Sequence, residues 1–83
     1  MKYTVVWQKT AEDALADLWT NAPDRNAVAA ATEQVDRLLE RDPSTRGESR
    51  VEPFRVLFEP PLGIDFEVIE PDRAVRVLRV WRI

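Results

Sequence analysis

The second part of the sequence, residues 50–83, alternates apolar and polar positions in three runs separated by short turns. Apolar residues recur at every second position, which is the period of a β-strand with one covered face. They are Phe54, Val56 and Phe58 in the first run, and Ile64, Phe66 and Val68 in the second. The pattern predicts a meander of three strands. The opposite face is expected to carry Arg55, Glu59, Asp65 and Glu67, with arginines of the last strand.

The first part of the sequence predicts one strand followed by two helices. Residues 2–8 alternate as a strand does, and from Thr10 the apolar residues follow helical spacing. Thr10 is followed three residues later by an acid, which is close to a capping box, so we expect Thr10 to be the N-cap of the first helix. Asp24 is expected to cap the second helix. Pro23 and Pro43 stand where the two helices should end.

Each predicted helix carries a single apolar stripe, and the simplest interpretation is that both stripes belong to the core. The stripes comprise Ala11, Ala14, Leu15, Leu18 and Trp19 in the first helix, and Val28, Ala31, Val35, Leu38 and Leu39 in the second. The small side chains of Ala27, Ala30 and Ala31 are expected to let the two helices approach closely as an antiparallel hairpin.

These elements predict an α+β fold, in the order β-α-α-β-β-β, built from two layers. We expect one domain over residues 1–83, with an antiparallel four-stranded sheet of order 1-4-3-2 and the helical hairpin on one face. Residues 74–82 then form a central strand, which fits their apolar character. Pro53 cannot donate a ladder hydrogen bond, so the first meander strand should be an edge strand or be bulged there.

The residue composition argues against a metal site or a disulfide. The sequence has no cysteine and no histidine, so a zinc site would need carboxylates alone, and we expect neither a metal nor a cofactor. It opens with no signal peptide and contains no apolar run near the roughly 20 residues that span a bilayer. We therefore expect a cytoplasmic protein without a membrane segment.

The basic residues beyond position 10 are all arginines, which suit bidentate contacts with phosphate or carboxylate. A base-composition preference for arginine would explain the same pattern. Residues 1–43 carry five basic and eight acidic side chains, whereas residues 44–83 carry seven of each. The net charge of −3 argues against a large nonspecific nucleic-acid footprint.

The element order, taken with a set of spaced residues, resembles the RelE/ParE superfamily of type II toxins over essentially the whole chain. The residues that carry the resemblance are Trp7, Leu18-Trp19, Asp42-Pro43, Gly47-Glu48, Phe54-Arg55-Val56, Val75, Val77, Val80 and Arg82. The resemblance implies a toxin that a cognate antitoxin holds inactive by wrapping its sheet and helices. Some members of this superfamily cleave mRNA in the ribosomal A site, and others poison DNA gyrase without being nucleases.

Two arginines are matched to the RNA-cleaving branch by this resemblance, and one carboxylate is the available candidate for the base. Arg55 stands where that branch has an arginine in its second strand, and Arg82 stands near the basic residue that ends its last strand. Such arginines stabilise the charge of a phosphorane transition state. Glu48 is the available general base. The chain departs from the pattern because it ends at Ile83 without the terminal tyrosine, which leaves the general acid unassigned.

Three further residues are candidates for nucleic-acid binding: Arg50, Arg79 and Trp81. Trp81 has the side chain to stack on a nucleobase. Each candidate also has a structural alternative. Arg55 has the alternative of a cross-strand pair with Glu67 or Glu59, and Trp81 that of a core or rim position.

Three functions follow from the resemblance. The first, which we favour from the sequence, is a ribosome-dependent mRNA endoribonuclease that uses Arg55, Arg82 and Glu48. The second is a ParE-like gyrase inhibitor, which needs no acid-base pair. The third is a non-toxic family member that acts as an interaction module. The expected partners are an antitoxin, the ribosome with mRNA or DNA gyrase, and a second copy of the chain in a homodimer, because an exposed strand edge invites pairing.

Overall fold

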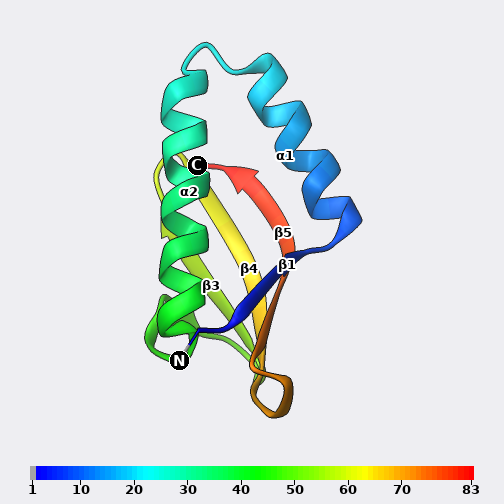
Figure 1. Cartoon of the computed structure of the whole chain (residues 1–83). Helices are drawn as coiled ribbons and strands as arrows, with labels where there is room; N and C mark the ends of the chain where they lie inside the picture. The colour runs from blue at the N-terminus through cyan, green and yellow to red at the C-terminus, as the bar shows by residue number, and fades with distance from the viewer. Residues whose placement is uncertain (1) are drawn as a thin grey trace.

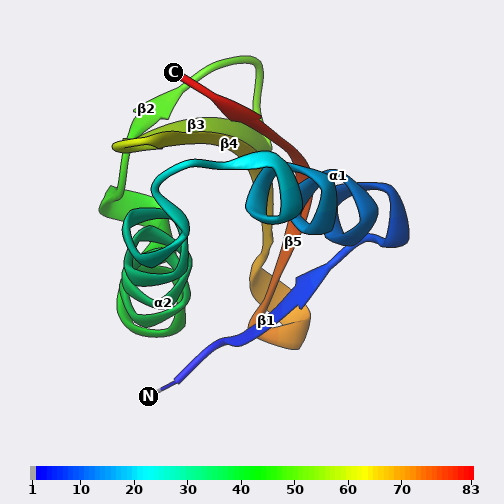
Figure 2. The ribbon, with the colours of Figure 1, turned by 90° about the horizontal axis from the view of Figure 1, so that it is seen from above.

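Two helices pack on one side of a twisted sheet in the computed structural model, which describes residues 2–83 (Figures 1 and 2). Short 3₁₀ turns, Pro43–Thr45 and Glu70–Asp72, form two of the connections between the helices and strands. The helices and strands are β1 (Thr4–Trp7), α1 (Lys9–Asn21), α2 (Arg25–Arg41), β2 (Glu48–Ser49), β3 (Phe54–Glu59), β4 (Leu62–Ile69) and β5 (Ala74–Arg82).

The sheet has five strands in the order β1-β5-β4-β3-β2. The predicted order of the four long strands is confirmed, with β5 between β1 and β4. The prediction of a four-stranded, wholly antiparallel sheet is wrong, because β1 pairs parallel with β5. The reason is β2, which lies in the predicted polar loop and pairs antiparallel with β3. This extra reversal before β3 inverts the direction of the whole meander relative to β1.

In β3, the residues that face the helices are not the ones that were predicted. Leu57 pairs with Ile64, and the two belong to the core beneath the helices. Because side chains alternate along a strand, Phe54 and Phe58 lie on the opposite side and are exposed. We call this side the outer face. Its central part consists of the cross-strand sets Phe54-Glu67-Arg76, Val56-Asp65-Arg79 and Phe58-Gly63-Trp81.

The predicted polar face is therefore divided between the two sides of the sheet. Arg55 pairs with Phe66 and lies on the helix side, whereas Asp65 and Glu67 lie on the outer face. The assignment of Phe54 and Phe58 to a covered side is wrong, whereas Val56 on the same face is buried, with 2% exposed. The β3 strand also begins after Pro53, at Phe54, and is flanked on its outer edge by β2 alone.

The core lies between the helices and the β3-β4-β5 part of the sheet. Phe66, Leu39, Leu62 and Ile64 are among its largest fully buried side chains. The predicted stripe of α2 is confirmed, since Val28, Ala31, Val35 and Leu39 are all buried. In α1 only Ala11 is fully buried, while Ala14, Leu15 and Leu18 pack against the core from its rim.

The helix ends differ in detail from the prediction. The first helix begins at Lys9 after Gln8, so Thr10 is inside the helix and the prediction that it is the N-cap is wrong. Asp24 does precede α2, but its side chain makes no capping hydrogen bond. Ala27 and Ala30 are exposed, so the predicted close approach through these residues is wrong, and of the three only Ala31 is buried.

The two-sided sheet predicts losses of stability of very different size for the same substitution at two phenylalanines. Phe66→Ala should lower the free energy of unfolding by about 3–5 kcal/mol, because it leaves a cavity in a site that is 0% exposed. Phe58→Ala, at a site that is 49% exposed, should cost about 1 kcal/mol or less. Urea unfolding of both variants checks this, and equal losses would contradict the observed register of β3.

Candidate functional site

Arg55 holds the loop that precedes β2. Its Nε donates a hydrogen bond of 2.9 Å to the carbonyl oxygen of Arg46, and its Nη2 donates one of 3.3 Å to the carbonyl oxygen of Gly47. Gly47 has a positive φ of 64°, and a Cβ there would overlap the carbonyl of Val56. The guanidinium of Arg55 is thus engaged by backbone carbonyls and not by Glu67 or Glu59.

Arg82 is held by Asp24, which lies between α1 and α2. The two guanidinium nitrogens donate hydrogen bonds of 3.0 and 2.7 Å to the two carboxylate oxygens of Asp24. The hydrogen bonds from Arg82 lower the pKa of Asp24, although some desolvation opposes the shift. The same bonds raise the pKa of Arg82. This pair ties the connection between the helices to the end of β5.

Glu48 and Arg50 lie at the β2 edge of the sheet. Both side chains are exposed, and their charged atoms are 4.0 Å apart. Glu48 pairs with Val56 and so projects on the outer face, whereas Arg55 projects on the helix side. Arg55 and Arg82 pair with Phe66 and Leu62, which are about 13 Å apart along β4. The structure does not bring Arg55, Arg82 and Glu48 together.

Arg79 and Trp81, by contrast, lie together on the outer face. The guanidinium carbon of Arg79 is 5.7 Å from the centre of the Trp81 ring, and Arg79 also forms an ion pair of 2.6 Å with Asp65. Phe58 approaches Trp81 edge to face, with ring centres 6.2 Å apart. Of the three predicted nucleic-acid contacts, Arg50 alone lies away from this group.

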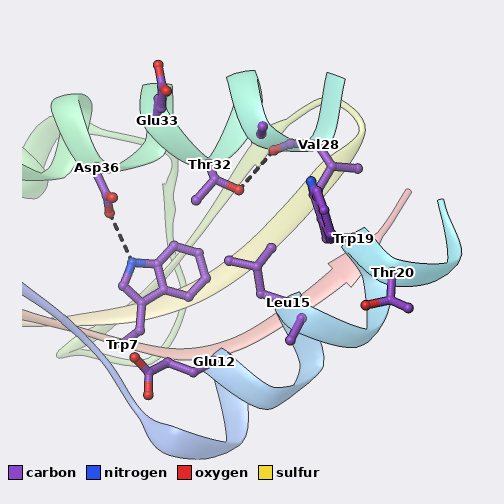
Figure 3. A pocket seen from close by; sticks show the side chains of 11 residues that line it. Trp7, Glu12, Leu15, Trp19, Thr20, Val28, Thr32, Glu33 and Asp36 are labelled. Atoms are coloured by element: carbon purple, nitrogen blue, oxygen red, sulfur yellow. Dashed lines mark hydrogen bonds between the residues drawn. The ribbon is translucent and has the colours of Figure 1, made fainter. Parts of the chain in front are cut away.

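A groove lies between α1 and α2 (Figure 3). Its volume is about 630 Å³. Leu15 and Val28 contribute apolar side chains from the two facing helices, and Trp19 lines the end near the connection between them. Ala16 and Ala29 also line it, and their short side chains leave the space open.

The rim of the groove is acidic. Glu12 lies on α1, and Glu33 and Asp36 lie on α2. Asp36 accepts a hydrogen bond of 2.9 Å from the indole nitrogen of Trp7, which fixes that ring at one end of the groove. An apolar floor with carboxylates at its edge suits a partner segment that carries apolar side chains flanked by lysine or arginine.

The hydroxyl of Tyr3, the only tyrosine of the sequence, is bonded to Glu70. Its hydroxyl donates hydrogen bonds of 2.6 and 3.0 Å to the two carboxylate oxygens of Glu70. This contact raises the pKa of the Tyr3 hydroxyl, with burial and the charge of Glu70 adding to the shift. Ser44 also donates a hydrogen bond to Glu70, so the cluster joins the start of β1 to both 3₁₀ turns.

Within residues 2–83, no group of three or more acidic, histidine or cysteine side chains is arranged to hold a metal ion. No helix in this part of the chain has the length and apolar character that crossing a membrane requires.

Comparison with known proteins shows similarity in structure. No family model matches the sequence, and no curated protein matches it. The RelBE2 toxin-antitoxin complex of Mycobacterium tuberculosis contains a chain with a TM-score of 0.77 and 23% identity, covering 100% of this chain and 93% of that chain. The chromosomal ParDE system of P. aeruginosa gives a TM-score of 0.76 and 23% identity, covering 99% and 97%.

The archaeal RelE-RelB complex from Pyrococcus horikoshii gives a TM-score of 0.70 and 15% identity, covering 99% of this chain and 96% of that chain. The likeness to all three structures spans almost the whole length of the chain. The chain therefore shares the fold of these three chains, with two helices and a five-stranded mixed sheet.

Sequence reasoning missed the groove because it assigned both helical stripes wholly to the core. One signal for the groove was present in the sequence. In the first helix Ala16 lies between the large residues Leu15 and Trp19, and in the second helix Val28 is followed by Ala29. The outer-face group of Phe58 and Trp81 was missed for another reason, since Phe58 was assigned to the covered side.

The ion pair between Asp24 and Arg82 predicts a pH-dependent contribution to stability. Because the pKa of Asp24 is lower in the folded chain, the pair should stabilise the fold above the unfolded pKa of about 3.9 and lose that effect as pH falls further. Asp24→Asn should therefore lower the melting temperature near neutral pH, and the difference from wild type should shrink towards pH 2.

Thermal unfolding by circular dichroism at several pH values measures this difference. Asp13→Asn is a matched control, because Asp13 contacts only Lys9 on the exposed side of α1. A deficit of Asp24→Asn that stays constant down to pH 2 would show that the ion pair does not cause it.

Proposed function

We propose that this chain is the toxin of a type II toxin-antitoxin module and that a protein antitoxin holds it inactive. The observation that carries the proposal is the likeness in fold to chains of toxin-antitoxin complexes over 99% or more of its length. The groove between α1 and α2 supports it, because it offers an unfilled apolar surface on a small protein. We assign this groove to the antitoxin.

We propose further that the toxin acts by binding its target, as a ParE-like gyrase inhibitor does, and not by cleaving RNA. Two contacts support this choice. The guanidinium of Arg82 is paired with both oxygens of Asp24, and that of Arg55 with two loop carbonyls. Glu48 projects on the other side of the sheet from Arg55.

The acid-base chemistry of RNA cleavage also lacks a clear pair of residues. The sequence has no histidine, and the hydrogen bond to Glu70 raises the pKa of Tyr3. A proton donor or acceptor with a pKa near the working pH contributes roughly 10²–10⁴-fold to such reactions. A binding mechanism needs no such group.

The second candidate is a ribosome-dependent mRNA endoribonuclease that uses Arg55, Arg82 and Glu48. The observation that favours it is the exposure of the Asp24-Arg82 pair, whose side chains are 38% and 40% exposed. A phosphate of bound RNA could replace the Asp24 carboxylate on Arg82 at modest cost, because exposed ion pairs contribute little. A third candidate is a non-toxic member of the superfamily that serves as an interaction module.

Induced expression of the chain in a bacterial host separates these three functions. We expect growth arrest with a DNA-damage response and intact transcripts, judged by primer extension on abundant mRNAs. The control is the same gene with an early stop codon. Cuts at codon positions in translated mRNA would replace the binding mechanism by the endoribonuclease, and normal growth with folded protein present would overturn the toxin assignment.

The groove predicts which surface mutations abolish neutralisation. We expect a small gene adjacent to this one to encode the antitoxin, and its coexpression to restore growth. Ala29→Glu should reduce that rescue by about tenfold or more in colony counts, because a charged side chain would enter the apolar floor.

Ala30→Glu is the matched control, since Ala30 is exposed on the next position of α2 and does not line the groove. Rescue is the number of colonies with the coexpressed antitoxin divided by the number without it. Each variant is thus normalised to its own toxicity. Equal rescue of both variants would move the antitoxin site away from the groove.

A further inference from the structure

We propose that the outer face of the sheet is a second docking surface, which binds a protein target carrying carboxylates beside apolar side chains. The inference rests on the proposed function, because it names the surface with which the toxin would contact its target. The outer face lies on the side of the sheet opposite α1 and α2 (Figure 2), whereas the groove lies between those helices. One surface would thus serve the target and the other the antitoxin.

The aromatic part of the outer face is held in place by a glycine. Gly63 lies between Phe58 and Trp81 in the sheet. A Cβ at Gly63 would come within 2.7 Å of the Trp81 ring, so the indole lies directly over this glycine. Phe58 then meets Trp81 edge to face at an interplanar angle of 82°. The pair is already arranged in the free chain, which lowers the entropy cost of binding.

In the two ion pairs of the outer face, the arginine is more exposed than its acidic partner. The Arg79 side chain is 74% exposed, whereas its partner Asp65 is 23% exposed. Arg76, 3.1 Å from Glu67, is 46% exposed, and Glu67 is 15% exposed. In both pairs the carboxylate lies nearer the sheet and the guanidinium group stands outermost. Arg79 lies beside Trp81, Arg76 lies in the set of Phe54, and Glu48 is exposed at the β2 edge of the same face. A partner therefore meets arginine and aromatic side chains first.

This arrangement favours an acidic protein surface as the partner. Arginines and aromatic residues are the side chains that most often carry the binding energy of protein interfaces. An incoming carboxylate can accept hydrogen bonds from Arg79 while apolar atoms cover Phe58 and Trp81.

A polyanion and a second copy of the chain fit the outer face less well. Asp65, Glu67 and Glu48 balance the nearby arginines, so the face supplies little of the net positive charge on which nucleic-acid affinity depends. Two copies meeting through this face would bring their outermost guanidinium groups together, and like charges at an interface oppose association.

The test uses growth arrest by the full chain and two variants of the outer face. Arg79→Glu reverses an exposed charge, and Phe58→Ser removes half of the aromatic pair. Each variant should give at least about tenfold more surviving colonies than wild type at equal protein level. Arg41→Glu, an exposed charge reversal at the end of α2, should arrest growth as wild type does. Circular dichroism confirms that each variant is folded.

The outcomes separate the two proposals. A wild-type chain that does not arrest growth overturns the toxin function itself. A wild-type chain that arrests growth, with both folded outer-face variants equally active, overturns the docking surface and leaves the toxin function intact.

Two in vitro measurements exclude other occupants. Wild-type chain that binds labelled single-stranded oligouridine in fluorescence anisotropy, with binding lost in Arg79→Glu, would assign the face to nucleic acid. A dimer in analytical ultracentrifugation that Phe58→Ser dissociates would assign it to a second copy. Either result overturns the protein target, and we expect neither.

Discussion

The covering of one side of the β3-β4-β5 sheet by two helices is the constraint on which the rest of this structure depends. Phe66, Ile64 and Leu62 bring large apolar side chains of β4 to that side, and α2 meets them with Val35 and Leu39. The chain is small, so burial on this one side must supply most of its stability. On the other side Val56 is buried, but Phe54, Phe58, Arg76 and Arg79 stay exposed and are available for contacts with partners.

Two arginines in this fold hold connections of the chain. Arg55 fixes the loop before β2 through two carbonyls, and Arg82 joins the end of β5 to Asp24 between the helices. Neither contact requires a bound phosphate, and both use the planar, multidentate geometry that distinguishes arginine from lysine. Arg55 and Arg82 stand at positions that resemble those of a nuclease, but their structural contacts are sufficient to explain why arginine is there. This is why the proposed function is binding and not cleavage.

The groove and the outer face differ in chemistry, and the difference gives them separate proposed roles. The groove has an apolar floor with an acidic rim from Glu12, Glu33 and Asp36. The outer face has aromatic side chains beside outward-standing guanidinium groups. Surfaces of opposite outermost charge select different partners, because like charges at an interface are unfavourable. Such a division lets a toxin be bound by two partners of different character.

The sequence by itself determined the order of the elements, the helical stripe of α2 and the sequence of the four long strands across the sheet. These features follow from local periodicity and from short connections, which the chain carries residue by residue. Only the tertiary structure decided which side of β3 is covered, since alternation separates two faces of a strand without saying which one is buried. The two-residue β2, the parallel pairing of β1 with β5 and the partners of Arg55 and Arg82 were decided there too. Each depends on segments that meet only after the chain has folded.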